Sequence, residues 1–454
     1  MTDLPASGQA VKPARVPKPF TITHRMVLGL AVPMTLAYMT TPLLGLVDTA
    51  VVGRLDDAAL IGGLAVGSII VDVIFTTFNF QRSGTTGLAA QAVGAEDEVE
   101  KQAILIRALI LAVFAGILLA ALSPLILAAG LWAIAPGEAV AEATSIYFLI
   151  RMLSAPFVLT NYAVLGWLIG LGRSGLALGL QVLLNGVNIV LSIWLGLVLE
   201  WGIEGVAWAT VAAELLAMIA GLALFIRLAD LRFRPKRANI TDLAAIMRLV
   251  NLNGDIMIRS FVLLSAFAFF TSRGAQFGEV TLAANAVLLH LLMLSAYFLD
   301  GMATAAEQIA GRAIGANYRE GFIRGVKLTM AWNAAIAAVL AAIFLAGGNL
   351  VVALITTLTE VRQQAADYLL LAALSPITAV LAFQMDGVYI GSTWSREMSK
   401  MMVASFAIYI LAWWLLQPLG NTGLWLALHV FFIARGVSLT MRIPANLQRS
   451  FAPN

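Results

Sequence analysis

The chain has 454 residues, of which 61% are hydrophobic and only 12% are charged, and its mean hydropathy is +0.91. Soluble domains carry about 25% charged residues, so this composition excludes a water-soluble protein and predicts an integral membrane protein. Cysteine is absent, which excludes a disulfide framework, thiol chemistry and a cysteine-based metal site. Lys and Arg (28) slightly exceed Asp and Glu (25), but no basic soluble surface accompanies them, so we expect no nucleic-acid partner.

Twelve apolar stretches follow one another between polar loops. A hydrocarbon core about 30 Å thick requires roughly 20 residues of helix, and each stretch is long enough. We therefore predict an all-α polytopic membrane protein with twelve transmembrane helices. The expected spans are residues 25–52, 59–82, 102–130, 143–168, 176–199, 205–227, 244–271, 280–304, 324–353, 364–390, 399–417 and 422–442.

The N-terminal segment predicts the orientation of these spans. Residues 1–20 are rich in proline and basic residues and lack the apolar core of a signal peptide, which indicates a disordered cytoplasmic tail. With this start, nearly all Lys and Arg residues lie on or next to cytoplasmic segments, as the positive-inside rule requires. We expect a multi-pass protein of the bacterial inner membrane with both termini in the cytoplasm. The exceptions are Arg54, Arg273 and Arg362 in outside loops and Arg151 and Arg259 within spans.

The first span carries a carboxylate, Asp48, about five residues from its outer end, or roughly 7 Å below it. An ionisable group in a membrane is costly and usually faces a cavity, so Asp48 is the leading candidate for ion coupling. A structural role, with Asp48 bonded to neighbouring hydroxyls and amides, is the alternative. Pro33 and Pro42 interrupt the hydrogen-bond ladder of the same span and predict a bend that could shift with protonation.

The last three spans of the first half can place polar groups near Asp48. Asn185, Asn188 and Ser192 follow one another at spacings of three and four, which puts them on one helical stripe in the span 176–199. Thr210 comes to a similar depth, and Tyr147 lies nearer the outer mouth. The spacing predicts a small polar pocket, although such groups can also serve only as hydrogen bonds between helices.

Several motifs do not indicate an enzyme. The sequence GLGRSG at residues 170–175 fits a dinucleotide pattern but joins two membrane spans, where small residues serve close helix packing. No phosphate-binding GxxxxGK[ST] motif occurs, so uphill transport would require an ion gradient. The three histidines are scattered without metal-ligand spacing. We therefore expect no enzyme activity, no cofactor and no metal site.

The two halves of the chain repeat each other. A shift of 221 positions places Tyr147–Ser154 on Tyr368–Ser375 and Ala89–Ala95 on Ala310–Ala316. This repeat predicts two pseudo-symmetric lobes of six helices around a central cavity. A basic segment between the halves reads as a cytoplasmic linker, with a lipid-headgroup site as the lesser option. The expected divisions are a tail (1–20), the first lobe (21–230), the linker (231–241), the second lobe (242–444) and a cytoplasmic tail (445–454).

The second half carries its own intramembrane charges, deeper towards the cytoplasm. Asp255 and Arg259 are four residues apart, Asp300 and Glu307 lie at the inner end of the span 280–304, and Asp386 lies low in the span 364–390. We interpret them as a charged gate that closes the inner side of the cavity. A cation or substrate site built on Asp255 and Asp386 remains an alternative.

Several segments together resemble the multidrug and toxic compound extrusion (MATE) family in its DNA-damage-inducible F branch. They are PLLGLVDTAVVG around Asp48, LNGVNIVLSIWLGL after residue 183, GVAWATVAAE at residues 205–214, DIMIRS at 255–260, AYFLDG at 296–301 and LGNTGLWLAL at 419–428. The resemblance covers nearly the whole chain after residue 20. It implies two six-helix lobes and export of amphiphilic, often cationic compounds in exchange for H⁺ or Na⁺. Residues matching Tyr147, Asn188 and Thr210 assist the aspartate in proton-coupled members. Ser192 departs from that pattern, because an aspartate is common at its position.

The first hypothesis is therefore an ion-driven antiporter with small amphiphilic substrates, surrounded by membrane lipids and acting as a monomer. The nearest alternative is a lipid or lipid-linked sugar flippase of the same superfamily. Such flippases line the cavity with several arginines, whereas the sequence suggests only Arg151 and Arg259 within spans. A membrane-embedded enzyme is the third possibility and lacks a convergent catalytic set.

Overall fold

A computed structural model describes residues 16–55 and 57–451, and every regular element in these ranges is helical. The first lobe comprises α1 (His24–Val52), α2 (Ala58–Phe78), α3 (Phe80–Ala95), α4 (Glu98–Ile134), α5 (Glu138–Met152), α6 (Ala155–Gly170), α7 (Ser174–Ile193) with the π-helical turn η1 (Trp194–Val198), and α8 (Gly202–Leu228). The short η2 (Leu231–Phe233) and α9 (Arg237–Ile240) lead to the second lobe. That lobe comprises α10 (Leu243–Gly274), η3 (Ala275–Phe277), α11 (Glu279–Gly315), α12 (Arg319–Ile355), α13 (Thr359–Gly391), α14 (Ser395–Leu416), η4 (Gln417–Leu419) and α15 (Gly420–Ser450).

These helices account for the twelve expected membrane crossings. Ten stretches of the described chain are long and apolar enough to span a bilayer, and the bent pair α5 and α6 forms an eleventh. The last stretch, Ser395–Ser450, is 56 residues long, and α14 packs against α15, so it doubles back and crosses twice. The helices run beyond several predicted ends, and residues 445–450 continue α15.

Two crossings of the first lobe are interrupted rather than straight. A helix boundary at Asn79 separates α2 from α3, and α5 meets α6 at an angle of 50°. Pro156 in the first turn of α6 cannot donate a backbone hydrogen bond to the preceding turn, which favours the bend. Gly116 of α4 lies against this bend, where an added Cβ would stand 2.4 Å from the Pro156 Cα. The predicted span 143–168 is thus a broken crossing.

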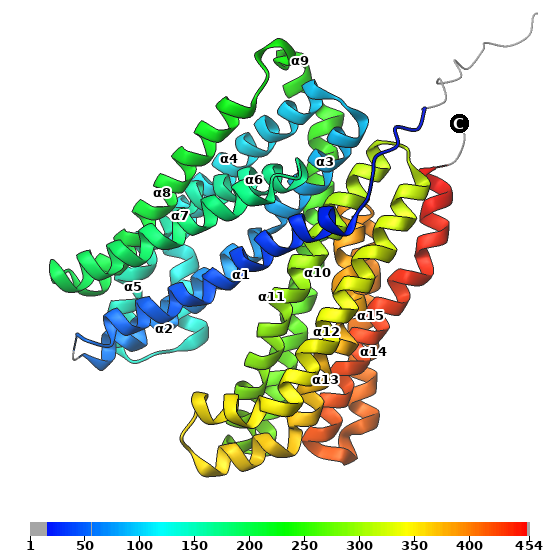
Figure 1. Ribbon diagram of the computed structural model, residues 1–454. Helices are drawn as coiled ribbons and strands as arrows, with labels where there is room; N and C mark the ends of the chain where they lie inside the picture. The colour runs from blue at the N-terminus through cyan, green and yellow to red at the C-terminus, as the bar shows by residue number, and fades with distance from the viewer. Residues whose placement is uncertain (1–15, 56, 452–454) are drawn as a thin grey trace, which may run out of the picture.

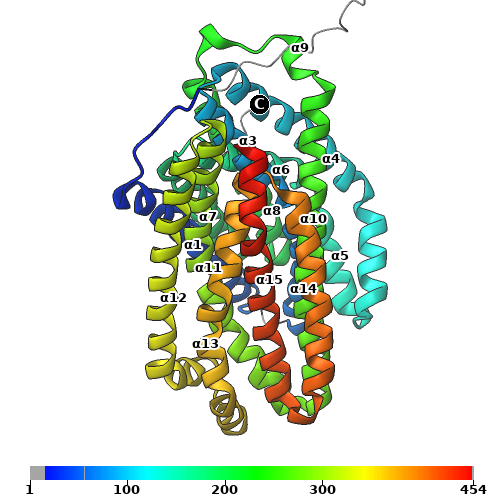
Figure 2. The same cartoon turned by 90° about the vertical axis from the view of Figure 1, so that its right-hand side faces the viewer.

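The two lobes meet at one end of the molecule and diverge towards the other (Figure 1). In Figure 2 the second lobe lies in front of the first. We call the end that carries α9 and the end of α15 the closed end, and the opposite end the open end. At the closed end α3 of the first lobe packs against α10, α11 and α13 of the second. At the open end the tips of the lobes, including the turn between α1 and α2 and the turn after α12, stand apart in Figure 1.

The closed end is held by direct backbone approach between the lobes. An added Cβ on Gly94 would lie 1.9 Å from the Arg312 carbonyl oxygen, and one on Gly315 would lie 1.9 Å from that of Gln91. Only glycine permits such contact. The Gln91 side chain also donates to the Gly391 carbonyl and the Thr393 hydroxyl, both at 3.1 Å. The closed end is therefore a tightly packed interface rather than a loose contact.

Helix α1 belongs to both lobes. Its first half packs on α11, where Leu30 and Ala31 share a buried cluster with Met302 and Ile309. Its second half packs on α7 and ends in the core of the first lobe through Val52. The prolines predicted to bend this span, Pro33 and Pro42, lie within the helix. One helix therefore connects the closed-end interface to the region of Asp48.

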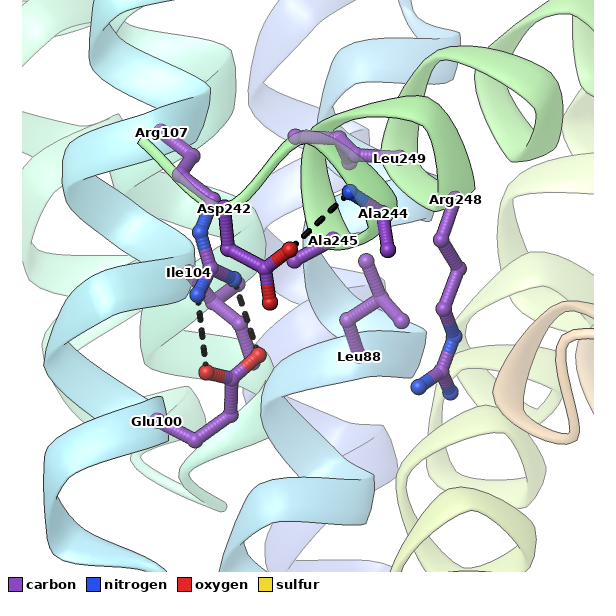
Figure 3. A pocket seen from close by; sticks show the side chains of 9 residues that line it. All are labelled: Leu88, Glu100, Ile104, Arg107, Asp242, Ala244, Ala245, Arg248 and Leu249. Carbon is purple, nitrogen blue, oxygen red and sulfur yellow. Dashed lines mark hydrogen bonds and ion pairs between the residues drawn. The ribbon is translucent and has the colours of Figure 1, made fainter. Parts of the chain in front are cut away.

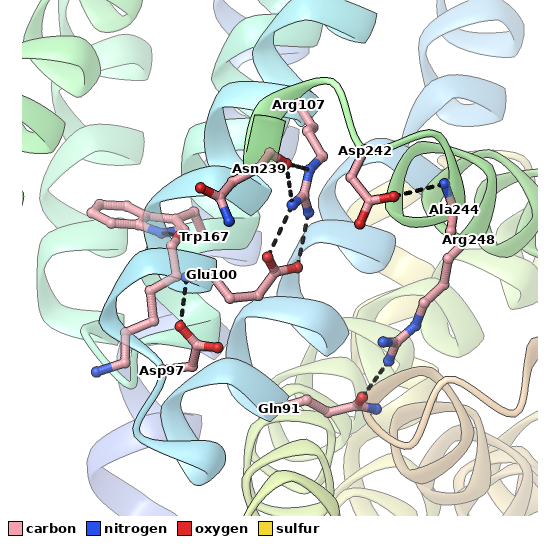
Figure 4. Close-up of polar contacts among 10 residues, drawn as sticks. Gln91, Asp97, Glu100, Arg107, Trp167, Asn239, Asp242, Ala244 and Arg248 are labelled. Carbon is pink, nitrogen blue, oxygen red and sulfur yellow. Dashed lines mark hydrogen bonds and ion pairs between the residues drawn. The ribbon is translucent and has the colours of Figure 1, made fainter. Parts of the chain in front are cut away.

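The linker between the lobes is anchored to the first lobe. Arg107 of α4 pairs with Glu100 through two hydrogen bonds of 2.8 and 2.9 Å and also donates to the Asn239 carbonyl of α9 (Figure 4). Asp242 then caps α10 by accepting from the Ala244 amide. Beside this clamp lies a pocket of about 350 Å³ with walls from both lobes, including Leu88 and Arg107 on one side and Asp242 and Arg248 on the other (Figure 3).

The described N-terminal segment crosses the closed end. The Lys18 amide donates to the Ala316 carbonyl of the second lobe at 2.9 Å, while its ammonium binds the Ala95 carbonyl and the Glu96 carboxylate of the first. The nearby ammonium lowers the pKa of Glu96, so this pair persists at neutral pH and weakens as the carboxylate is protonated in acid. Residues 1–15 of the predicted tail lie outside the described residues.

Gly315→Ala should open the closed end. The added methyl group must displace the Gln91 carbonyl, and overpacking of this kind costs about 1–3 kcal/mol. Because the lobes are packed bundles, separation at the closed end should bring the open ends together. Spin labels on cysteines introduced at the exposed Glu200 and Gln276 should report a shorter distance. Gly175→Ala, whose Cβ meets nothing within 4 Å, is the control. Unchanged distances in both variants would contradict this description.

Candidate functional site

Asp48 lies in a buried hydrogen-bond chain formed by three helices of the first lobe. Its side chain is 7% exposed and accepts a hydrogen bond of 2.8 Å from the Ser192 hydroxyl of α7. Asn188, one turn earlier on α7, donates to the Thr210 hydroxyl of α8 at 2.8 Å. Thr210 in turn donates to the Val206 carbonyl. The chain therefore runs from Asp48 on α1 through α7 to α8.

The hydrogen bonds of Ser192 depend on whether Asp48 carries a proton. Its hydroxyl oxygen lies 2.8 Å from Asp48 Oδ1 and 3.2 Å from Asn188 Oδ1, but a serine has only one hydrogen to donate. An ionised Asp48 takes that hydrogen. A protonated Asp48 can donate to the Ser192 oxygen, which frees the serine hydrogen for Asn188. Ser192 and Asp48 are hydrogen-bonded to each other in both states, whereas Asn188 Oδ1 receives the serine hydrogen only when Asp48 is protonated. The pocket can therefore hold Asp48 in either state.

Two further predicted residues lie beside this chain with different partners. Asn185 donates to the Thr40 hydroxyl of α1 at 2.6 Å, which gives α1 and α7 a second contact one turn from the Thr210 bond. Tyr147 bonds Ser68 of α2 at 3.5 Å and hydrogen-bonds to Arg151 on its own helix, rather than to Asp48. Helical spacing predicted the stripe of α7 but could not determine which neighbour each side chain meets.

A cavity of about 320 Å³ lies in the first lobe, on the closed-end side of Asp48. Its apolar walls include Phe75 of α2 and Leu180 of α7. Such a mixture of apolar walls and a few polar groups is typical of small-molecule sites. The polar residues that line it include Asp72, Arg82, Arg151, Asn161, Asn185 and Glu214.

The second lobe contains a buried charge cluster around Asp386 of α13. Arg435 of α15 binds both oxygens of this carboxylate, and Arg259 of α10 binds one of them. Arg435 is 1% exposed and Asp386 is 7% exposed. Asp386 therefore already has two guanidinium partners, which leaves it poorly suited to a dissolved cation. Asp255 does not pair with Arg259 and instead accepts a hydrogen bond of 2.7 Å from Ser395.

The remaining predicted gate residues face the first lobe. Glu307 of α11 is 3% exposed, hydrogen-bonds to Thr86 of α3 and interacts electrostatically with Arg82 of the same helix. Asp300, two turns earlier on α11, lies in the field of Arg82 and Arg259. One Glu307 oxygen and one Arg82 nitrogen are buried without a hydrogen-bond partner. Opposite charges from the two lobes thus face each other across the interface.

Sequence reasoning missed Arg82 and Arg435. Arg82 is the last residue of the predicted span 59–82, and Arg435 lies two turns before the end of the predicted span 422–442. The positive-inside rule therefore assigns both arginines to the cytoplasmic side. The structure buries Arg435 and aims Arg82 across the lobe interface. The statement that only two arginines lie within the spans is therefore wrong. The span predicted for residues 59–82 ends at Arg82, whereas in the structure helix α3 continues from Phe80 to Ala95. The sequence pattern therefore did not reveal that Arg82 lies in the interior.

Comparison with known proteins places these features in context. The MatE family model matches residues 33–194 and again residues 256–415, one match in each lobe. The chain is 38% identical over 426 residues to "DNA damage-inducible protein F" of Escherichia coli (strain K12), covering 92% of each protein. It is 28% identical to the "Probable multidrug resistance protein NorM" of Caulobacter vibrioides, covering 91% of this chain and 89% of that protein.

Solved structures share the fold. One described as an outward-facing conformation of a multidrug resistance MATE family transporter aligns with a TM-score of 0.84 at 18% identity, covering 93% of this chain and 96% of the other. A second, a transporter of the same superfamily from Pyrococcus furiosus described as having a binding pocket of reverse polarity, aligns with a TM-score of 0.80 at 22% identity, covering 93% and 96%.

Arg435→Met should destabilise the second lobe. The change leaves Asp386 buried with Arg259 alone, and breaking a buried ion pair costs about 3–5 kcal/mol. Thermal unfolding of the purified protein, followed by tryptophan fluorescence, should show a clearly lower midpoint. Arg449→Met removes only an exposed pair with Glu397 and should change little. Equal midpoints for the two variants would show that the cluster does not stabilise the lobe.

Proposed function

This chain belongs to the MatE family of multidrug and toxic compound efflux transporters, and from that premise we propose that it exports amphiphilic cations in exchange for protons. It is a multi-pass membrane protein and not an enzyme. The observation that carries the proposal is the buried Asp48, whose hydrogen-bond chain accommodates both an ionised and a protonated carboxyl group. Burial of a carboxylate favours its neutral form, which allows proton uptake in the physiological range.

The bonding of Asp48 determines how tightly α1 is held to α7. An ionised carboxylate accepts a charge-assisted hydrogen bond from Ser192, and such bonds contribute about 1.5–3 kcal/mol. Protonation weakens this bond and frees the outer half of α1. Because the inner half of α1 packs on α11, a bend near Pro42 can pass the change to the closed-end interface. Proton binding thereby biases the rocking of the two lobes.

The second lobe supplies the inner gate in this proposal. Arg82 of the first lobe faces Glu307 and Asp300 of the second, and these pairs would separate when the closed end opens. Separated charges are costly while they stay buried and need water to solvate them. The pairs can therefore separate only when the packing at Gly94 and Gly315 also opens. The gate is thus a charged interface, and Asp386 with its two arginines braces it from within the lobe.

Protons suit the Asp48 site better than sodium ions. Sodium requires several oxygen ligands arranged around it, whereas Asp48 is bonded to one hydroxyl within a chain of hydrogen bonds. The described residues contain no group of three or more His, Asp or Glu side chains that could hold a metal ion. Asp386, the other candidate, is already paired with Arg259 and Arg435. These features favour H⁺ as the coupling ion.

The distribution of basic residues supports a cytoplasmic closed end. Lys18, Arg248 and Arg449 lie at this end, whereas Arg54 and Arg362 lie near the open end. The open end would then face the outside of the inner membrane of a bacterium, and both termini would lie in the cytoplasm. We propose that the protein acts as a monomer. The exported compound would leave through the open end while Asp48 takes a proton from outside.

A flippase remains the second candidate, because the cavity of the first lobe is lined by Arg82 and Arg151. Guanidinium groups bind phosphate well. However, Arg82 already faces Glu307, and the cavity also contains Asp72 and Glu214, which would repel an anionic headgroup. The charge balance therefore favours a cationic substrate over a lipid phosphate.

Asp48→Asn should abolish coupled export. Asparagine keeps the size of the side chain and can still bond to Ser192 but cannot exchange a proton. In liposomes with an imposed pH gradient, we expect efflux of the cationic dye ethidium to fall at least tenfold. Scrambling of a fluorescent lipid, in the absence of a gradient, serves as the readout for a flippase. Dye export by the variant at the wild-type rate would remove coupling from Asp48.

Ser192→Ala tests whether the effect of proton binding at Asp48 reaches α7 through Ser192. The variant keeps the carboxylate of Asp48 but loses the hydroxyl that links it to Asn188. We expect dye-driven proton movement to continue at a rate reduced severalfold, since one charge-assisted bond is lost. Replacing a pH gradient by a sodium gradient should drive no efflux in either the variant or the wild type. Efflux driven by sodium alone would show that the coupling ion is misassigned.

A further inference from the structure

The cavity of the first lobe and its immediate surroundings contain more negative than positive groups. Arg82 and Arg151 line it, together with Asp72 and Glu214. Asp48 lies close behind its wall and interacts electrostatically with Arg151. Three carboxylates of the first lobe therefore share this region with two arginines.

Arg82 is not available to neutralise these carboxylates. It interacts electrostatically with Glu307 and Asp300 of the second lobe and hydrogen-bonds to Asn79 at 3.0 Å. Arg151 is the remaining cation. Its field acts on Asp48, Asp72 and Glu214. Within the described residues, none of these three carboxylates forms an ion pair shorter than 4 Å.

Glu214 is the carboxylate that lines the cavity and is also buried. It is 9% exposed, whereas the side chain of Asp72 is exposed. The Asn161 amide of α6 donates to its carboxylate at 2.7 Å and to its backbone carbonyl at 3.0 Å. Of the helices packed around it, α5 contributes Arg151 and α6 contributes Tyr162, while α7 contributes only neutral polar groups to the cavity wall.

Counting charges shows that this arrangement requires a proton or another cation. If Asp48 and Glu214 were both ionised, two buried carboxylates would share the single charge of Arg151. An uncompensated buried charge is costly, and a group in this position takes up a proton instead. Coupled carboxylates of this kind lose their protons in separate steps. Glu214 lies one turn after Thr210 on α8, and Thr210 ends the hydrogen-bond chain that begins at Asp48.

We propose that Glu214 is a second proton-exchanging site of the first lobe and that it binds the positive charge of the exported compound. This inference rests on the proposed antiport function and specifies where the substrate and the proton compete. Glu214 faces the cavity, whereas Asp48 lies behind its wall. An organic cation that enters the cavity takes the place of the proton on Glu214, and that proton leaves to the water that reaches Asp72. Asp48 keeps its own proton until α1 moves.

Infrared difference spectroscopy of the purified protein tests the inference without transport. Protonated carboxyl groups absorb separately from ionised ones, so a pH titration counts buried acids that lose protons. We expect Asp48 and Glu214 to contribute two such signals in the wild type, in addition to any from the buried Glu307 of the second lobe. Asp48→Asn should remove one and Glu214→Gln the other. Gln preserves the acceptor oxygen for Asn161, so the fold should persist, and elution as a single species checks this. Glu204→Gln, at an exposed position in the first turn of α8, is the matched control.

Two further measurements complete the test. Addition of tetraphenylphosphonium, a monovalent organic cation, should convert the Glu214 signal from protonated to ionised in the wild type and leave the Asp48 signal in place. Arg151→Gln should make both carboxyl signals persist to a higher pH, because the shared cation is gone. A merely structural Glu214 would produce neither change.

The inference is overturned if Glu214→Gln has the same carboxyl signals as the wild type, or if tetraphenylphosphonium alters only the Asp48 signal. Failure of the antiport proposal would give a different experimental result. In that case the dye export of the wild type would not respond to a pH gradient, even though the Glu214 signal is present in the spectrum. The two hypotheses can therefore fail independently.

Discussion

The division of α1 between the two lobes is the constraint on which the structure depends. Its inner half is buried against α11, and its outer half is hydrogen-bonded to α7 through Thr40 and Asp48. A packed helix interface has discrete arrangements rather than a continuum. A small movement of the outer half of α1 must therefore bend the helix where its backbone hydrogen bonding is interrupted. Pro33 and Pro42 provide such points, because each removes one backbone hydrogen bond.

The two lobes use charge in different ways although they derive from one repeated unit. In the second lobe, Asp386 is saturated by two arginines and forms a fixed brace. In the first lobe, Asp48 and Glu214 are held by hydroxyl and amide groups, which tolerate both protonation states. Fixed ion pairs stabilise a structure, whereas carboxylates without a dedicated cation can exchange protons. In the proposed mechanism the second lobe therefore gives support and the first lobe exchanges ions.

The closed end combines two kinds of contact that must release together. Glycines such as Gly94 and Gly315 allow the backbones of α3 and α11 to touch, and Gln91 bonds across to α13. Arg82 adds an electrostatic contact with Glu307 in the same region. Close packing is short-ranged and the charge interaction acts over longer distances. Opening of the closed end would require both kinds of contact to be broken.

The sequence by itself determined the membrane class, the twelve crossings, the repeat and the stripe of Asn185, Asn188 and Ser192, because these follow from hydrophobic length and helical spacing within one segment. Only the tertiary structure decided that Arg435 meets Asp386, that Arg82 crosses the lobe interface and that Glu214 lines the cavity. Those pairings join residues tens to hundreds of positions apart. They depend on how helices rotate and pack against one another, and no local pattern encodes that rotation.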